Sequence, residues 1–164
     1  MGSGKTTKML AMFDTYKRRK KKPIIIKPCL DDREGKFIGW GVTKSRILTV
    51  EEPTYYFQDL KSELLELDFK CLFVDEVQFL KSHQIDELFE VAVCLDIPVI
   101  CYGLRTDFKM QGFEGSTRLL LLAHSIEELK TICKCGRKAV LNGRKINGKF
   151  VFEGKQVAID NVDN

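Results

Sequence analysis

The sequence contains no apolar segment long enough to cross a membrane, which excludes a membrane-spanning helix within it. No signal-peptide pattern is visible, and there are no internal repeats or low-complexity segments, so a repeat architecture is excluded as well. What remains is a chain of 164 residues with 44% hydrophobic and 30% charged residues, a balance typical of a globular protein. This length is sufficient for one domain with a sizeable core and a small appendage.

The cysteines lack the spacing of a disulfide framework. Three of them, Cys71, Cys94 and Cys101, lie in or beside apolar runs, where a thiol behaves as a small hydrophobic group. The remaining three of the six are Cys29, Cys133 and Cys135. We therefore expect a reduced, cytoplasmic protein.

The net charge is only +4, and much of it comes from one basic run over residues 17–22. Such a run could bind nucleic acid or an acidic surface, or it could be the solvated end of a helix, where cations complement the helix dipole. The run has no interleaved aromatic residues, and the charge excess is small for binding a phosphate backbone. We therefore expect neither a nucleic acid nor a membrane as a partner.

Strands that alternate with helices predict an α/β domain with a mostly parallel sheet flanked by helices. Short apolar runs predict strands over residues 23–27, 46–50, 70–75 and 97–102. Helical spacing predicts helices over residues 5–20, 57–67, 82–95 and 116–130, the first with core contacts at Met9, Leu10, Met12 and Phe13. Polar stretches with glycines predict loops over residues 28–45 and 104–115, and the tail after Lys130 predicts a small β-rich unit.

The stretch Gly2-Ser3-Gly4-Lys5-Thr6 matches the second half of a phosphate-binding loop, which reads G-x-x-x-x-G-K-[ST]. Small residues there allow backbone N–H groups to face phosphate oxygens, the lysine reaches the β- and γ-phosphates, and the threonine hydroxyl joins the Mg²⁺ shell. The alternative is a chance match in an artificial Met-Gly-Ser start. Alone, this half-motif does not decide between the two.

A second motif, Phe73-Val74-Asp75-Glu76, is an apolar strand that ends in two acids. In phosphate-loop enzymes an acid at this place holds Mg²⁺ through its water shell, and ligands bind at the carboxyl ends of the strands. The neighbouring acid, Glu76, could point to the other side and accept a proton. The alternative is that the pair caps the following helix. The glycine loop in the same chain favours the catalytic interpretation.

A third motif, Cys133-Lys134-Cys135-Gly136, could hold a metal ion. A structural zinc site needs four ligands, and this motif supplies two. Neither His83 nor His124 lies in the tail, so neither is an obvious third ligand. By itself the motif is equally compatible with two unligated thiols in a turn.

Together, three longer stretches resemble the type II thymidine kinases, and most closely a bacterial subgroup whose first zinc pair is C-x-C. They are V-D-E-V-Q-F-L at 74–80, L-D-I-P-V-I-C-Y-G-L-R-T-D-F at 95–108 and E-L-K-T-I-C-K-C-G-R-K-A at 128–139. The resemblance extends over essentially the whole chain. It implies a phosphate-loop kinase domain over residues 1–130 and a small zinc-binding domain with a lasso loop over residues 131–164.

The resemblance implies transfer of the γ-phosphoryl group of ATP to the 5′-hydroxyl of thymidine or deoxyuridine, with ATP, Mg²⁺ and structural Zn²⁺ required. Glu76 is the implied general base, and Cys133 and Cys135 are implied zinc ligands. Thr6 and Asp75 are the implied residues of the Mg²⁺ shell. The implied ATP-binding residues are Gly2, Ser3, Gly4, Lys5, Thr6, Thr7, Asp31, Asp32, Arg33, Asp75 and Gln78.

On the nucleoside side, the resemblance implies contacts from Phe108 and Phe113 and from a lasso that closes over the base. The implied lasso residues are Gln156, Val157, Ala158, Ile159 and Asp160. The family usually has V-I-G-G in the lasso, whereas this chain has Ala158-Ile159-Asp160-Asn161. Loss of both glycines removes access to positive φ and close backbone approach, so the lasso is expected to differ in shape.

In the family, an apolar strand precedes the M-x-S-G-K segment and a second zinc pair follows the lasso. The resemblance therefore implies that the sequence given lacks the first strand, part of the phosphate loop and two zinc ligands beyond residue 164. It also implies a homotetramer inhibited by dTTP. Three alternatives stay open: a deoxynucleoside kinase with another base preference, a non-catalytic partner derived from a kinase, and a zinc-containing nucleic-acid-binding module.

Overall fold

The computed structural model describes residues 4–28, 38–44, 49–55, 64, 67–133 and 135–156. A five-stranded sheet forms the centre of the molecule, in the order β2-β3-β1-β4-β5. β1 pairs in parallel with β3 and β4, β4 pairs in parallel with β5, and β2 runs antiparallel to β3. The strands are β1 (Pro23–Ile26), β2 (Ile38–Lys44), β3 (Thr49–Tyr55), β4 (Cys71–Val74) and β5 (Val99–Cys101).

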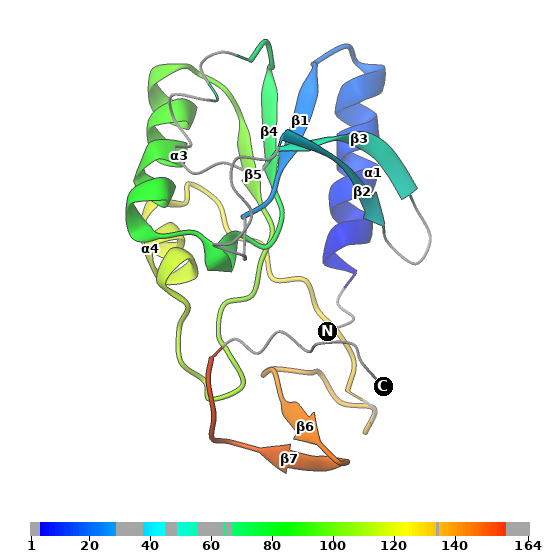
Figure 1. The fold of residues 1–164 in the computed structure, drawn as a ribbon, viewed down its shortest axis with the longest axis vertical. Helices are drawn as coiled ribbons and strands as arrows, with labels where there is room; N and C mark the ends of the chain where they lie inside the picture. The colour runs from blue at the N-terminus through cyan, green and yellow to red at the C-terminus, as the bar shows by residue number, and fades with distance from the viewer. Residues whose placement is uncertain are drawn as a thin grey trace.

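Helices cover both faces of the sheet (Figure 1). One face carries α1 (Lys5–Arg18), and the other carries α3 (Ser82–Cys94) and α4 (Glu114–Leu122), with the 3₁₀ turn η1 (Val77–Phe79) following β4. The four side chains of β4 are all buried and alternate between the faces. Cys71 and Phe73 belong to the apolar cluster of α1, whereas Leu72 and Val74 belong to the cluster of α3. This double coverage explains why β4 is a continuous apolar run.

The core on the α1 side is built around Phe73. Its ring makes edge-to-face contacts with Phe13 and Tyr16, and both pairs of ring centroids are 5.7 Å apart. Met9 and Leu10 of α1 are fully buried in the same cluster. Because each such side chain contributes roughly 1.5–3 kcal/mol when fully buried, this cluster fixes α1 against the sheet.

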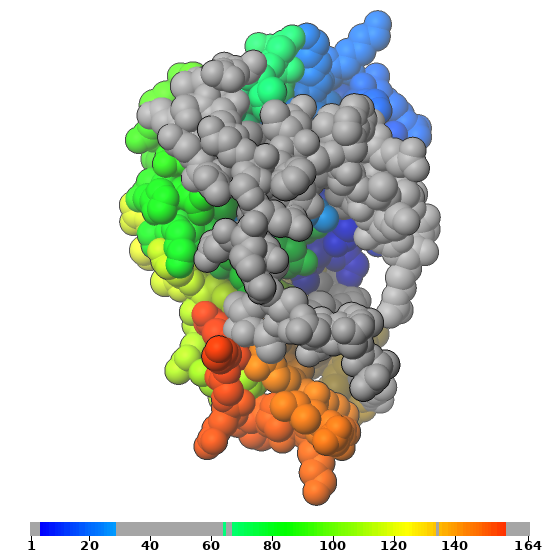
Figure 2. Space-filling model, viewed as in Figure 1, coloured from blue at the N-terminus to red at the C-terminus, as the bar shows by residue number. Residues whose placement is uncertain are grey.

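A small unit lies beyond the carboxyl ends of the parallel strands (Figure 1), and its atoms gather at one end of the molecule (Figure 2). It contains the antiparallel hairpin of β6 (Arg144–Ile146) and β7 (Lys149–Val151). Asn147 and Gly148 both have positive φ, at 48° and 77°, as a tight two-residue hairpin turn requires. The Asn142 side chain donates to the Thr106 carbonyl at 2.7 Å, which joins the unit to the loop after β5.

Most of the predicted elements are confirmed, with shorter bounds. One predicted loop is wrong in part. The predicted loop over residues 28–45 contains β2, whose glycines suggested a loop but whose backbone pairs with β3 along its whole length. Of the predicted strand over residues 46–50, residues 49 and 50 belong to β3, which continues to Tyr55, and residues 46–48 lie outside the described residues. Long-range pairing decides these elements, and local composition does not reveal it.

The predicted helix over residues 116–130 is also wrong beyond Leu122, where α4 ends. Ala123 has an extended backbone, and the chain then crosses to the small unit without further helix. The apolar spacing continues at Ile126, but that side chain is 64% exposed and so has no core to pack against. The predicted helix over residues 57–67 lies mostly outside the described residues, within which Leu64 is helical and buried. No helix in the described part of the chain is long and apolar enough to cross a membrane.

Candidate functional site

The carboxyl ends of β1, β4 and β5 meet at one edge of the sheet, on the side of the small unit (Figure 1). The backbone there is joined by hydrogen bonds across the strand ends. The Asp75 N–H donates to the Ile26 carbonyl at 3.0 Å, and the Val77 N–H donates to the Tyr102 carbonyl at 3.0 Å. These contacts hold the two acids after β4 at the place where ligands bind in open α/β sheets.

The start of α1 has the features of a phosphate site. Gly4 caps the helix in the left-handed conformation, with φ of 68°, and its carbonyl accepts the Lys8 N–H at 2.9 Å. Lys5, Thr6 and Thr7 form the first turn, which contains no acidic residue. The helix dipole and the N–H groups of this turn therefore favour an anion. The other predicted ATP-binding residues, Gly2, Ser3, Asp31, Asp32 and Arg33, lie outside the described residues.

Asp75 is a buried carboxylate, with 3% of its surface exposed. Its Oδ2 lies 3.4 Å from the Lys27 ammonium, and its Oδ1 accepts the Glu76 N–H at 3.1 Å. Burial raises the pKa of Asp75, Lys27 counteracts part of this shift, and the neighbouring Glu76 adds to it. A carboxylate that is poorly solvated gains from a nearby cation, so this oxygen donor set fits the Mg²⁺ shell that accompanies a nucleoside triphosphate.

Glu76 adopts the left-handed conformation, with φ of 54°, which is uncommon for a residue other than glycine. This conformation turns the chain sharply between β4 and η1. The carboxylate is half-buried, and its Oε2 accepts a hydrogen bond from the Gln78 amide nitrogen at 2.6 Å. Backbone strain of this kind persists where the surrounding structure holds it, and it is often found at functional sites.

The loop after β5 brings both predicted aromatic residues to the same edge. Phe113 is buried and its ring meets that of Phe79 edge to face, with centroids 5.8 Å apart. Phe108 is also buried, and the Arg144 guanidinium from the small unit lies 3.9 Å from its ring centroid. A guanidinium over an aromatic face is an attractive contact. The structure therefore brings Phe108 to the boundary between the main domain and the small unit, whereas the described ring contact of Phe113 is with Phe79 of the main domain.

Gln156 is the one predicted lasso residue within the described part of the chain. Its amide nitrogen lies 3.2 Å from Asp107 Oδ2 and 3.3 Å from the Gly112 carbonyl, and its own carbonyl accepts from Arg144 at 3.2 Å. Partial desolvation acts to raise the pKa of Asp107, but the N–H groups of Gln111 and Lys109, and the Gln156 amide, hold it below its ordinary value. The other predicted lasso residues, Val157, Ala158, Ile159 and Asp160, lie outside the described residues.

Asp107 and Arg144 also belong to this region, although neither was predicted from the sequence. Asp107 lies in the L-R-T-D-F stretch, directly before Phe108, and this position next to a predicted substrate-contacting residue could have indicated it. Its Oδ1 accepts the Lys109 and Gln111 N–H groups at 2.7 and 2.9 Å, which shapes the turn that positions Phe108. No feature of the sequence near Arg144 indicates its role, because Arg144 contacts Phe108 only when the small unit folds against the loop after β5.

Cys133 and Cys135 are both exposed and lie in one tight turn. The Cys133 N–H donates to the Arg137 carbonyl at 2.8 Å, and the Gly136 N–H donates to the Cys133 carbonyl at 2.9 Å, with Gly136 at φ of 82°. Such a turn presents two thiols in the manner of half a zinc knuckle, and thiolates are the ligands that structural zinc prefers. Among the described residues, no group of three or more potential ligands is present. The two thiols have the donor chemistry of two of the four ligands that a structural zinc ion takes.

The cysteines of the sheet have a different chemistry from those at the surface. Burial raises the pKa of both Cys71 and Cys101 to about 12, so at pH 8 only about one thiol in 10,000 is ionised. We expect iodoacetamide at pH 8 to modify the exposed Cys94 within minutes and to leave Cys71 and Cys101 unmodified until urea unfolds the protein. Peptide mass spectrometry measures this. Equal labelling of Cys71 and Cys94 in the native protein would contradict the burial of β4.

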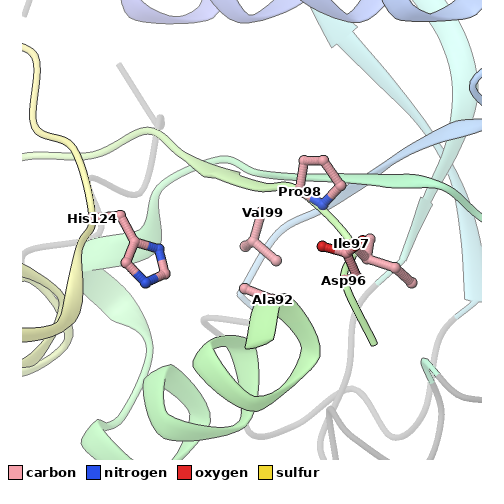
Figure 3. A pocket seen from close by; sticks show the side chains of 6 residues that line it. All are labelled: Ala92, Asp96, Ile97, Pro98, Val99 and His124. Atoms are coloured by element: carbon pink, nitrogen blue, oxygen red, sulfur yellow. The ribbon is translucent and has the colours of Figure 1, made fainter. Parts of the chain in front are cut away.

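A separate hollow of about 350 Å³ lies where α3 ends and β5 begins (Figure 3). It is lined by Ala92, Asp96, Ile97, Pro98, Val99 and His124. The His124 ring is 5.8 Å from that of Phe89, centroid to centroid. This hollow is at the amino end of β5, whereas Asp75 and Glu76 lie at the carboxyl edge of the sheet. It contains none of the predicted site residues and does not belong to the candidate site.

Known proteins resemble this chain over nearly its whole length. A family profile described as "Thymidine kinase" matches residues 1–161. The chain is 44% identical to a thymidine kinase from Vibrio vulnificus, with 99% of this chain and 86% of the relative aligned. It is 42% identical to a thymidine kinase from Lactiplantibacillus plantarum, with 97% of this chain and 83% of the relative aligned. Together with the geometry at the carboxyl edge of the sheet, these matches show that the chain belongs to the thymidine kinase family.

Proposed function

We infer that this protein catalyses the thymidine kinase reaction, in which the γ-phosphoryl group of ATP is transferred to the 5′-hydroxyl of thymidine to give dTMP in nucleotide salvage. The observation that carries this inference is the Asp75-Glu76 pair at the end of β4. One acid is buried beside a lysine, and the other is half-buried with a single amide contact among its described hydrogen bonds. The two acids are thus suited to two tasks, cation support and proton acceptance.

In the proposed mechanism, Gly4, Lys5 and Thr6 bind the phosphates of ATP at the start of α1. Thr6 and Asp75 would hold Mg²⁺, and a bound Mg²⁺ would neutralise negative charge on the phosphates. Glu76 accepts the proton of the 5′-hydroxyl as the oxygen attacks the γ-phosphorus, and ADP leaves from the opposite side. Catalysis of this kind is mostly positioning and charge stabilisation, which a rigid strand end provides.

On the nucleoside side, we propose that Phe108 and Phe113 contact the base, with Gln156 at the start of the lasso. Support comes from the contact of Phe108 with Arg144 of the small unit, and from the place of Phe113 in the same loop after β5, against Phe79. The segment Ala158-Ile159-Asp160 would complete the lasso. Because it lacks the glycines usual in the family, a second candidate function is a deoxynucleoside kinase with another base preference.

We further propose that residues 131–164 form a zinc-binding unit of the type II kinase group, appended to a kinase domain over residues 1–130. Cys133 and Cys135 would supply two thiolates to structural zinc. The exposed turn that they share supports this proposal, because it leaves both sulfurs accessible to a metal ion. Resemblance to the family also supports a cytoplasmic homotetramer with dTTP as a feedback inhibitor.

The direct test is transfer of labelled γ-phosphate from Mg·ATP to thymidine, deoxyuridine and deoxycytidine in separate reactions. We expect labelled dTMP, with kcat/KM for thymidine exceeding that for deoxycytidine by more than about tenfold. Faster transfer to deoxycytidine would favour the second candidate function. A folded protein that binds ATP but labels no nucleoside would contradict both.

A further inference from the structure

Gln78 is a buried polar residue that lies between the end of β4 and α4. Only 2% of its surface is exposed. Both ends of its amide have partners within the protein. The amide nitrogen donates to Glu76 Oε2 at 2.6 Å, and the amide oxygen accepts the Leu104 N–H at 3.0 Å. A buried amide satisfied at both ends has little capacity left for a ligand.

The orientation of this amide follows from its partners. The Leu104 N–H is a donor, so the Gln78 oxygen must face it, and the NH₂ group must then face Glu76. A hydrogen bond from an amide to a carboxylate restrains the orientation of that carboxylate. Glu76 is thereby held through one oxygen, and the hydrogen bonds of the described residues leave its other oxygen to meet a hydroxyl.

The loop after β5 is shaped around Gln78. A Cβ at Gly103 would lie 2.7 Å from the Gln78 amide oxygen, so a larger residue there would displace the amide. The Leu104 peptide is held from its other side as well, because the Ser116 hydroxyl donates to the Leu104 carbonyl at 2.6 Å. Gln78 therefore connects the carboxylate of Glu76 to the loop that carries Phe108 and to the first turn of α4.

We propose that Gln78 is a positioning residue for the phosphoryl transfer: it orients Glu76 and couples that carboxylate to the nucleoside-side loop through Leu104. This role replaces the direct ATP contact that the resemblance implies for Gln78. The inference rests on the proposed function of Glu76 as the base. The proposal also explains the order of residues after β4. Glu76 comes directly before the 3₁₀ turn and Gln78 lies within it, and this arrangement brings the two side chains into contact.

The test is a double-mutant cycle of Gln78→Met and Glu76→Gln, assayed for kcat and KM with Mg·ATP and thymidine. Methionine has a similar shape but cannot donate to the carboxylate. We expect Gln78→Met to lower kcat about 10- to 100-fold with little change in KM for ATP, because a hydrogen bond to a charged group is lost. In the Glu76→Gln background the same substitution should change kcat by less than about threefold, since a residue that acts through Glu76 has nothing further to position.

Four outcomes would overturn the inference. A raised KM for ATP with unchanged kcat would make Gln78 an ATP ligand, and an equal loss of kcat in both backgrounds would make it merely structural. Unchanged kcat and KM in Gln78→Met, with an active wild type, would remove its role while leaving the proposed function intact. An inactive wild type would overturn the proposed function and the inference with it.

A second variant keeps the inference testable if Gln78→Met does not fold. Ser116→Ala removes the hydrogen bond to the Leu104 carbonyl but removes neither partner of the Gln78 amide. We expect a smaller fall in kcat, about threefold to tenfold, that again disappears in the Glu76→Gln background. Thermal stabilisation by Mg·ATP equal to that of the wild type shows that the phosphate site is intact in each variant. An unchanged kcat in Ser116→Ala, or the same loss in both backgrounds, would contradict coupling through Leu104.

Discussion

Replacing Glu76 with glutamine is expected to lower kcat for thymidine phosphorylation by about 10²- to 10⁴-fold, the usual contribution of a positioned general base. Glutamine has the same shape and can still accept the hydrogen bond from Gln78 through its amide oxygen. It cannot accept the proton of the 5′-hydroxyl. The loss should therefore appear in kcat, with the affinity for Mg·ATP unchanged, as measured by labelled phosphate transfer and by isothermal titration.

Asp14→Asn is a matched control, because it also removes one carboxylate charge. Asp14 lies on the exposed side of α1 and pairs with Arg18 at 2.8 Å, one turn along the same helix. Exposed pairs of this kind contribute less than about 1 kcal/mol, so kcat should remain within about twofold of the wild type. If Glu76→Gln retains wild-type kcat, another group accepts the proton and the assignment of Glu76 is wrong.

Replacing Gly115 with alanine is expected to lower the free energy of unfolding by about 3 kcal/mol, or to prevent folding. Gly115 is buried in the first turn of α4, against η1. A Cβ there would lie 2.5 Å from the Leu80 carbonyl oxygen and 2.7 Å from that of Val77. Both are backbone atoms, so neither can move aside without displacing η1. Alanine favours a helix over glycine by about 1 kcal/mol, which is too small to offset this overlap.

Urea unfolding followed by circular dichroism measures the effect, and Gly112→Ala provides the comparison. A Cβ at Gly112 would lie 2.5 Å from the Thr117 hydroxyl oxygen, which is the end of a side chain that can rotate. Gly112→Ala should therefore be less destabilising than Gly115→Ala by at least about 1 kcal/mol. Equal stability of the wild type and Gly115→Ala would show that α4 does not approach η1 this closely. The same close approach positions Glu76 and Gln78, so activity should decrease together with stability.

Much of the fold could be predicted because its signals are local. The apolar run of β4 is buried on both faces, and such a strand needs no alternation to be recognised. The core contacts of α1 at Met9, Leu10 and Phe13 follow from helical spacing, and all three are buried. Where the prediction was wrong, in β2 and at the end of α4, the local pattern was overridden. In β2 the partner strand decided the structure, and after Leu122 the chain had no surface on which to pack a helix.

The candidate site shows the same division. Glycine, lysine and threonine at the start of α1, and two acids at the end of β4, are recognisable because each motif lies in one short segment of the chain. Asp75 and Glu76, for which the sequence predicts different tasks, have different surroundings. One is buried beside Lys27, and the other is half-buried and contacts Gln78. Those surroundings come from other parts of the chain and could not be seen in the motif.

By itself, the sequence determined the alternation of strands and helices, the phosphate-loop motif at the start of α1 and the membership of a kinase family, since each depends on residues close together in the chain. Only the tertiary structure decided how Glu76 is held, how Phe108 is covered and why Gly115 is glycine. Gln78 and Leu104 are 26 positions apart, and Gln156 and Asp107 are 49 positions apart. Such contacts form only when the carboxyl ends of the strands meet, because packing, and not local preference, brings distant segments to the same edge of the sheet.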